Sequence, residues 1–289
     1  IIEGNRNLSG TIPVSGAKNA ILPAMAACLL APGTSTLHNV PHLIDLKTMS
    51  LLLRVLGAKV EMENDVLSID ASHIDSYEAP YELVNKMRAS IYVLGPLLAR
   101  LGIAKVSFPG GCAIGTRPVD LHLMAMEALG AHITVEHGYI NAKADKLVGA
   151  DIYFPKSSVG ATINALMAAV LAKGVTSLFN AAMEPEIDAT IDFLNLMGAQ
   201  ISGKGTTTLV IEGVEKLHPT EMEMIPDRIE AGTFLIAGAL STNPVTVTNC
   251  NPNHLTLPLE KLRASGCELE VENCSITVYP PEIIQPVDI

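Results

Sequence analysis

A recurring pattern of about 70 residues constrains the fold of this chain more than any other feature of its sequence. Leucine-rich helical runs end in Gly-Ala or Gly-Cys, and a predicted strand follows each of them. The markers are Gly57-Ala58, Gly130-Ala131, Gly198-Ala199 and Gly266-Cys267. A glycine directly after a helical run is a common C-terminal cap. The recurrence therefore predicts a chain built from four copies of one structural unit.

Each unit is predicted to fold in the order α-β-α-β-β. It opens with a helix of small residues, continues through a β-branched strand and an amphipathic helix, and closes with two strands joined by a short turn. In the first unit the strand is predicted at 34–40, the second helix at 46–56, and the closing strands at 59–63 and 66–70. Such repeats cover their apolar faces only with neighbours, so we expect an α/β fold with sheets outside and apolar helices inside.

The composition favours a large buried core and argues against several classes of protein. Hydrophobic residues make up 48% of the chain, yet its apolar stretches are shorter than the roughly 20 residues that span a membrane. A formal net charge of -11 argues against nucleic acid or an anionic membrane as a partner. The first apolar segment has neither a basic leader nor a cleavage site, so we expect a cytoplasmic location. Cysteine and histidine spacings predict no disulfide framework and no metal site, and no cofactor is expected.

Polar or charged residues stand at the start of the first helix of each unit, namely Lys18, Arg88, Ser158 and Arg228. Helix N-termini carry unpaired N–H groups and the positive end of the helix dipole. Several such ends meeting in one place would bind phosphate groups. Taken alone, Lys18-Asn19 is better explained as a solvated first turn, and Ser158 makes a good N-cap whatever else it does.

The segment at 108–122 contains the residues most suited to chemistry. Three glycines within six residues let the backbone approach a ligand, and Cys112 stands among them. Arg117 nearby would lower the pKa of the Cys112 thiol, which could act as an acid or, once ionised, as a nucleophile, although a loop cysteine without a role is an equal alternative. Arg117-Pro118-Val119-Asp120 is predicted to open the next helix. His122 on that helix is interpreted as a structural histidine.

Several motifs taken together resemble the UDP-N-acetylglucosamine enolpyruvyl transferases of the EPSP synthase-like superfamily, and the likeness runs along essentially the whole chain. The motifs are Ser15-Gly16-Ala17-Lys18-Asn19-Ala20, Met87-Arg88-Ala89-Ser90, Pro109-Gly110-Gly111-Cys112 through His122, Ser158-Val159-Gly160-Ala161-Thr162, Glu184-Pro185-Glu186-Ile187 and Pro226-Asp227-Arg228-Ile229-Glu230. The resemblance implies an inside-out α/β barrel of two lobes, with four repeats present here and the C-terminal lobe truncated. It places the first lobe, of three repeats, at 18–226 and a partial second lobe at 1–17 with 227–289.

The same resemblance implies a reaction between two small-molecule substrates. The enolpyruvyl group of phosphoenolpyruvate passes to the 3-hydroxyl of UDP-N-acetylglucosamine with release of phosphate, the first committed step of peptidoglycan synthesis. Cys112 would be the proton donor and would also hold phosphoenolpyruvate covalently. The phosphoenolpyruvate contacts implied are Lys18, Asn19, Arg88 and Arg117. The UDP-N-acetylglucosamine contacts implied are Asn19, Arg88, Arg117, Pro118, Val119, Asp120, Leu121, Lys156, Ser158, Val159 and Gly160.

Two other functions stay open at this point. The shikimate-pathway enolpyruvyl transferases share the fold and the phosphoenolpyruvate chemistry, although Cys112 and Arg117-Pro118-Val119-Asp120 speak against them. A non-catalytic UDP-sugar-binding protein is the second alternative. In the family that this chain resembles, the carboxylate that takes the hydroxyl proton lies in a Phe-Pro-Thr-Asp motif that is absent from this sequence. We therefore expect the 289 residues alone to turn over slowly or not at all.

Overall fold

The computed structural model describes residues 7–108 and 119–288, which form two compact units. The larger unit is Lys18–Met224, and the smaller combines Ile1–Ala17 with Ile225–Ile289. Both are built from helices and four-stranded sheets, so the chain has an α/β fold. None of the helices in the described part of the chain is both long and apolar enough to cross a membrane.

One pairing pattern recurs in the sheets of the described residues. A short leading strand runs parallel to a central strand, and the central strand pairs antiparallel with the second strand of a hairpin. The larger unit contains β13 (Glu221–Glu223), β2 (Thr34–His38), β4 (Val66–Asp70) and β3 (Lys59–Glu63) in one sheet, β5 (Glu78–Ala79), β6 (Ile103–Ser107), β8 (Tyr139–Lys143) and β7 (His132–Glu136) in a second, and β9 (Asp151–Tyr153), β10 (Val175–Phe179), β12 (Thr208–Glu212) and β11 (Gln200–Ser202) in a third. The smaller unit contains β1 (Gly10–Pro13), β14 (Val245–Thr248), β16 (Ser275–Tyr279) and β15 (Glu268–Val271).

The leading strands β1, β5, β9 and β13 are absent from the predicted order α-β-α-β-β. At two to four residues each, they are too short to show an alternation of their own. Two of them also pair with distant segments, since β1 lies beside β14 while β13 lies beside β2. The N-terminal strand is thereby built into the smaller unit, next to a strand near the other end of the sequence.

In three of the sheets an asparagine follows the central strand, and its side chain makes a hydrogen bond to the end of the leading strand. The residues are Asn39, Asn180 and Asn249, with φ of 58°, 56° and 52°. Their side-chain amides donate to the backbone oxygens of Met224, Phe154 and Val14, at 3.0, 3.0 and 2.6 Å. Each acceptor is the residue directly after a leading strand. Asparagine suits this position because it tolerates the left-handed region and carries an amide donor.

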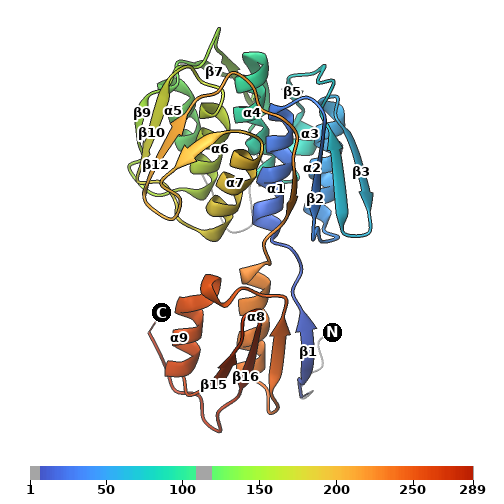
Figure 1. The fold of residues 1–289 in the computed structure, drawn as a ribbon, viewed down its shortest axis with the longest axis vertical. Helices are drawn as coiled ribbons and strands as arrows, with labels where there is room; N and C mark the ends of the chain where they lie inside the picture. Colours follow the sequence, from blue (N-terminus) through green and yellow to red (C-terminus); the bar gives the residue numbers. More distant parts are fainter. Residues whose placement is uncertain (1–6, 109–118, 289) are drawn as a thin grey trace. The chain divides into compact units, whose positions relative to one another are not determined.

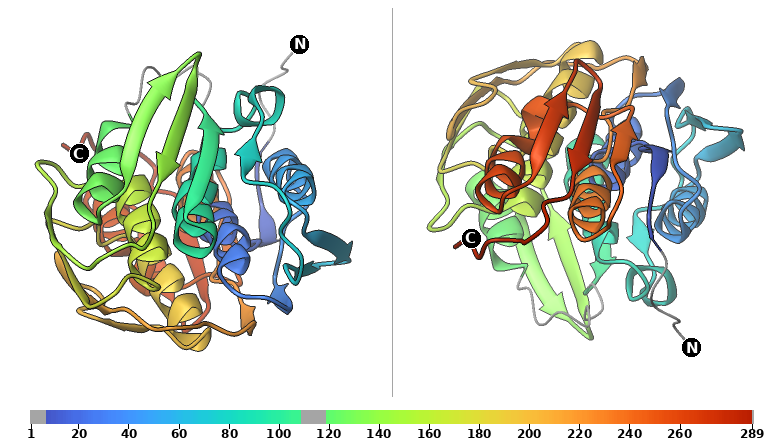
Figure 2. Two further views of the ribbon diagram at one scale, coloured as in Figure 1. Left: turned by 90° about the horizontal axis from the view of Figure 1, so that it is seen from above. Right: turned by 90° about the horizontal axis from the view of Figure 1, so that it is seen from below.

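Helices occupy the middle of the larger unit and the sheets lie around them. In Figure 1, α1, α6 and α7 stand between β2 and β3 on one side and β9, β10 and β12 on the other, and Figure 2 shows the same arrangement from above. The helices of this unit are α1 (Lys18–Ala27), η1 (Cys28–Leu30), α2 (Ile44–Val55), α3 (Tyr81–Val84), η2 (Arg88–Val93), α4 (Leu94–Leu101), α5 (Asp120–Ala128), α6 (Val159–Ala169) and α7 (Pro185–Leu196). Every residue of α6 from Ala161 onward is buried. The predicted arrangement of sheets outside and apolar helices inside is confirmed.

The helix and hairpin boundaries follow local sequence signals closely. The predicted helix at 46–56 is α2, and the predicted closing strands at 59–63 and 66–70 are β3 and β4. Gly57, the residue after the C-cap of α2, has φ of +109°, and a Cβ there would meet the backbone oxygen of His73 at 2.8 Å. The position therefore requires glycine both for its backbone conformation and for the close approach of the chain.

In the smaller unit, helices cover one face of a single sheet. The helices are α8 (Arg228–Ala239), η3 (Pro252–Leu255) and α9 (Thr256–Ala264). The core includes Leu235 of α8 with Val247, Ile276 and Val278 of the sheet. Only part of α8 is buried, and Ile229, Ile236 and Leu240 along it are exposed.

Candidate functional site

The start of α1 presents a lysine held by a carboxylate. Lys18 Nζ lies 3.3 Å from Oδ2 of Asp45, which stands in the first turn of α2. The two side chains are 40% and 31% exposed, so the ion pair stays in contact with solvent. Asn19, the next residue of α1, is exposed. Cation and amide are thus available to an anionic ligand at this helix start.

Arg88 is the first residue of η2, and its positive charge affects the pKa of two nearby side chains, His122 and Tyr92. Burial, with a smaller contribution from the charge of Arg88, lowers the pKa of His122 to about 4. Burial raises the pKa of Tyr92 to about 12, an effect that Arg88 partly offsets. Arg88 therefore lies within electrostatic reach of α5, which carries His122.

The start of α5 contains three of the predicted UDP-sugar contacts. Val119 is the residue before the helix and Leu121 is its second residue, and both are buried. Asp120 between them is exposed. Cys112, Arg117 and Pro118, which the sequence also places at the site, lie outside the described residues.

The N-terminus of α6 is capped by a serine, as predicted. Ser158 is the N-cap, and its Oγ accepts a hydrogen bond from the backbone N–H of Ala161 at 3.4 Å. Val159 and Gly160 are half-buried in the first turn, and Lys156 is exposed just ahead of it. The remaining N–H groups of this turn are without a partner inside the helix, which is the usual setting for binding an anion.

The starts of α5 and α6 touch each other. A Cβ built on Gly160 would lie 3.1 Å from both Cε1 and Nε2 of His122, and 3.9 Å from Cε1 of Tyr92 in η2. Helix α1 packs on η2 in the same unit. The structure thus brings residues 119–121, residues 158–160 and the segment that begins at Arg88 to one place. Helix N-termini and cations meeting in this way suit a ligand with phosphate groups.

Comparison with known proteins identifies the family of this chain. The family model described as EPSP synthase (3-phosphoshikimate 1-carboxyvinyltransferase) matches residues 2–289. A protein of Chlorobaculum parvum named UDP-N-acetylglucosamine 1-carboxyvinyltransferase is 57% identical over all of this chain and 69% of its own length. A protein of the same name from Desulfosudis oleivorans is 53% identical over all of this chain, again covering 69% of that protein. The chain belongs to the EPSP synthase family of carboxyvinyltransferases.

Solved structures of this family share the fold. The enolpyruvyl transferase NikO of Streptomyces tendae superposes with a TM-score of 0.83 and 25% identity, covering 97% of this chain and 68% of NikO. EPSP synthase of Acinetobacter baumannii superposes with a TM-score of 0.78 at 21% identity, covering 99% of this chain and 68% of that one. The predicted α/β fold of the enolpyruvyl transferases is therefore confirmed, while the number of repeats stays a prediction.

Sequence reasoning missed three residues that support the site. Asp45 holds Lys18, but nothing local in the sequence links the two. His122 was interpreted only as structural, and Asn164 of α6 was not singled out. Asn164 is fully buried and its Nδ2 lies 3.1 Å from Nδ1 of His122. An amide inside an otherwise apolar helix was the available signal, since a buried amide needs partners.

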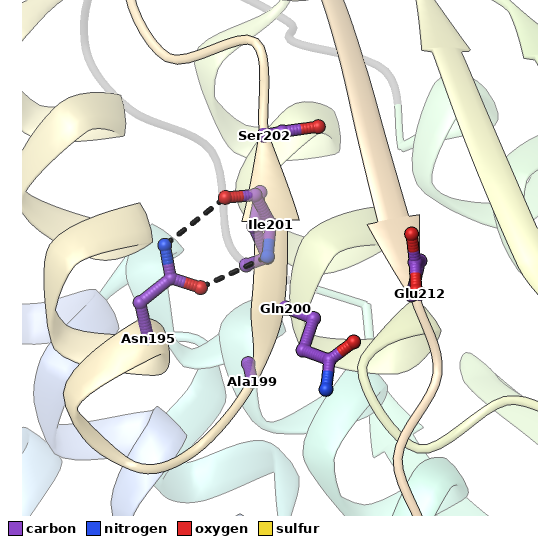
Figure 3. Close-up of a pocket in the computed structure, with 6 residues that line it drawn as sticks. All are labelled: Asn195, Ala199, Gln200, Ile201, Ser202 and Glu212. Atoms are coloured by element: carbon purple, nitrogen blue, oxygen red, sulfur yellow. Dashed lines mark hydrogen bonds between the residues drawn. The ribbon is translucent and has the colours of Figure 1, made fainter.

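A shallow hollow lies on the larger unit, away from the helix starts described above. It is lined by Asn195 of α7 and by residues of β11 and β12, including Ile201 and Glu212 (Figure 3). None of the predicted substrate contacts lines it. Among residues 7–108 and 119–288, no three histidine, cysteine or acidic side chains gather into a group that could hold a metal ion. The hollow therefore does not compete with the helix starts as the candidate site.

Proposed function

We propose that this chain binds UDP-N-acetylglucosamine and phosphoenolpyruvate and transfers the enolpyruvyl group to the sugar 3-hydroxyl, with release of phosphate. The observation that carries the proposal is the meeting of the α5 and α6 starts beside the residues that follow Arg88. A nucleotide sugar has a diphosphate, and two helix N-termini with nearby cations are suited to bind it. The names of relatives that are 53% and 57% identical support the same substrate.

The UDP moiety is assigned to the two helix starts. Ser158, Val159 and Gly160 would direct backbone N–H groups at the diphosphate, with Lys156 and Arg88 supplying positive charge. The residues Arg117, Pro118, Val119, Asp120 and Leu121 would contact the uracil and the phosphates from the α5 side, and Asn19 would contact the sugar. Hydrogen bonds to the charged diphosphate would be about twice as strong as neutral ones.

Phosphoenolpyruvate is assigned to the start of α1. Lys18 and Arg117 would hold its phosphate, with Arg88 and Asn19 beside them. Cys112 would donate a proton to C3 while the sugar oxygen bonds to C2 and the hydroxyl proton leaves. The resulting ketal then loses phosphate from C2 and a proton from C3, which restores the double bond. Cations near the phosphate stabilise the charge that develops in both steps.

The two compact units are assigned as the lobes of such an enzyme. The larger unit corresponds to the first lobe, and the N-terminal strand with the segment from Ile225 corresponds to the second. The reaction would serve peptidoglycan synthesis in the cytoplasm. Slow turnover by the 289 residues alone stays a prediction, which phosphate release in the presence of both substrates would check.

A binding experiment tests the proposed substrate without requiring turnover. Isothermal titration of the chain with UDP-N-acetylglucosamine should give saturable binding, while shikimate 3-phosphate should give none. Lys156→Ala should weaken UDP-N-acetylglucosamine binding, while Lys204→Ala should leave it unchanged because Lys204 pairs with Asp192 on another surface. Binding of shikimate 3-phosphate in place of the UDP-sugar would refute the proposal.

Mass spectrometry tests the role of the thiol. Attack of the Cys112 sulfur on C2, with a proton added at C3, would increase the protein mass by that of one phosphoenolpyruvate molecule. Cys274 is exposed and provides a matched control. The adduct should form in Cys274→Ser and should be absent from Cys112→Ser. An adduct that persists in Cys112→Ser would exclude Cys112 as the nucleophile.

A further inference from the structure

We infer that Asn164 is a positioning residue for nucleotide-sugar binding, because its side chain ties together the three segments that carry the proposed UDP contacts. These segments are η2, which begins at Arg88, and the starts of α5 and α6. The inference rests on the proposed function, since that function assigns the UDP-sugar to these segments. Asn164 would act through them and would not touch the ligand.

The side chain of Asn164 is fully buried and makes a hydrogen bond with each of three partners. Its Oδ1 accepts from the backbone N–H of Gly95 at 2.8 Å. Its Nδ2 donates to the backbone oxygen of Ile91 at 2.9 Å and to Nδ1 of His122 at 3.1 Å. The partners belong to α4, η2 and α5, so one amide on α6 joins four helical segments. A buried amide with matched partners favours one arrangement of its neighbours over others.

The contact with Gly95 fixes the junction between η2 and α4. Gly95 is the second residue of α4, and N–H groups in the first turn of a helix have no partner within it. Asn164 therefore supplies the missing acceptor from a neighbouring helix. The backbones approach so closely that a Cβ on Gly95 would lie 2.6 Å from both Oδ1 and the backbone oxygen of Asn164. The position of the η2 segment is thereby set relative to α6.

The contact with His122 fixes the start of α5 against the start of α6. The Nδ2 of Asn164 can only donate, so Nδ1 of His122 must accept and the ring proton must lie on Nε2. The Nε2 edge of this ring faces Gly160. His122 directly follows Leu121, and Gly160 lies about 6 Å along α6 from Asn164. The pair therefore holds two groups of proposed UDP contacts at a fixed separation.

Asn195 provides a control of the same residue type for this network, in an exposed position. It is also an asparagine in a helix of the larger unit, and it also bonds a neighbouring backbone through both ends of its amide. Its Nδ2 donates to the backbone oxygen of Ile201 at 3.1 Å, and its Oδ1 accepts from the N–H of the same residue at 2.9 Å (Figure 3). Asn195 is exposed, so water can reach the N–H and the carbonyl that its loss releases, whereas the groups released by loss of Asn164 are buried. No proposed UDP contact depends on it.

The test compares Asn164→Leu with Asn195→Leu in the 289-residue chain, because leucine removes the amide and keeps a similar volume. Titrations with UDP and with UDP-N-acetylglucosamine are made well below the unfolding midpoint of each variant. Asn164→Leu should bind both ligands at least tenfold more weakly than the wild type, while Asn195→Leu should bind within about twofold. Wild-type affinity in both variants would overturn the positioning role. An equal loss of ligand affinity in both variants would also overturn it, because a general loosening of the fold would then explain the weaker binding.

A second pair of variants applies if Asn164→Leu does not fold. His122→Asn keeps an acceptor near the position of Nδ1, whereas His122→Leu removes it. We expect His122→Asn to retain most of the UDP affinity and His122→Leu to lose at least tenfold. Equal affinity in the two variants would overturn the inference. Failure of the wild type to bind either ligand would instead refute the proposed function, so the two failures are distinguishable.

Discussion

Helices α6 and α8 are the first helices of their respective repeats, but their surroundings differ. Helix α6 is buried along its length from Ala161 to Ala169. Helix α8 has a similar composition of small and apolar residues, yet it buries Ala231, Leu235, Gly238 and Ala239 against its sheet while Ile236 and Leu240 are exposed. Composition therefore makes a helix suitable for burial, but the number of packed neighbours decides how much of it is buried.

The two helices also differ in where their polar groups are used. Helix α6 carries a buried amide, Asn164, which bonds to three other helical segments. Helix α8 uses its polar groups at its own N-terminus, where Asp227 Oδ1 accepts from the N–H groups of Ile229 and Glu230 at 2.9 and 3.1 Å. Glu230 in turn accepts from the backbone N–H and the hydroxyl of Ser15. A helix that packs against several other helices can thus hold a hydrogen-bonded amide in its middle. A helix that packs on one sheet has its polar contacts at its N-terminus.

The largest expected effect is the loss of stability when a buried side chain of α6 is shortened and leaves a cavity. Ile163 is fully buried, and Ile163→Ala should lower the free energy of unfolding by about 2–5 kcal/mol because it loses apolar burial and leaves a void. Chemical denaturation with urea measures this change. A loss below about 1 kcal/mol would show that the core around α6 is not closely packed, and the contrast with α8 would fail.

The second effect concerns the pH dependence of stability near α6. Burial lowers the pKa of His122 to about 4 in the folded chain, below the usual histidine value of about 6.5, so between these two pH values mainly the unfolded chain binds this proton. Above pH 6.5 the shift has no effect, and stability falls as pH is lowered, by about 2 kcal/mol at pH 5. His122→Asn lacks this ionisation and should lose less stability between pH 7 and 5. Parallel pH profiles for the two proteins would contradict the depressed pKa.

The third effect is the loss of stability when the N-cap of α8 is removed. Asp227→Ala removes the acceptor for two backbone N–H groups, so the free energy of unfolding of the smaller unit should fall by about 1 kcal/mol. Thermal unfolding followed by circular dichroism measures it. Asp227→Asn keeps an oxygen acceptor and should recover most of the loss. If Asn and Ala behave alike, the cap hydrogen bonds do not stabilise α8.

A smaller effect on stability is expected for the cap of α6. Ser158 makes one hydrogen bond to Ala161, at 3.4 Å, so Ser158→Ala should cost less than Asp227→Ala, on the order of 0.5 kcal/mol. The same substitution should weaken UDP-N-acetylglucosamine binding several-fold if Ser158 contacts the ligand as proposed. Titration calorimetry separates the two effects. Unchanged affinity would remove Ser158 from the proposed site.

The smallest effect is expected on the exposed side of α8. Ile236 is 53% exposed, so Ile236→Ala should change the free energy of unfolding by no more than about 0.5 kcal/mol. The urea titration used for Ile163→Ala provides the comparison. Similar losses for Ile163→Ala and Ile236→Ala would mean that the two helices are equally packed in solution.

Local features of the fold were readable from the sequence. The second helix of the first repeat and both strands of its closing hairpin were predicted within a few residues, because apolar periodicity and turn residues act over short distances. Gly57 marked the end of α2 for the same local reason. Ser158 was recognisable as an N-cap from its type and position. The family followed from several short motifs taken together.

The candidate site was only partly accessible in this way. Lys18, Arg88 and Ser158 stood out because charged or polar residues at helix starts are a visible pattern. The ion pair of Lys18 with Asp45 and the network around Asn164 did not stand out. Each depends on which helices pack together, and neither partner shows a local sign of the other.

The sequence by itself determined most of the recurring unit apart from its short leading strand, the second helix and closing hairpin of the first repeat, and the helix starts that carry charge. The tertiary structure decided that β1 joins the sheet of β14 while β13 joins that of β2, that α6 is enclosed while α8 is half-exposed, and that Asn164 meets His122. The physical reason is the range of the interactions. Capping and periodicity act over a few residues of one segment, whereas strand pairing and the partners of a buried amide depend on segments that come together only when the chain packs.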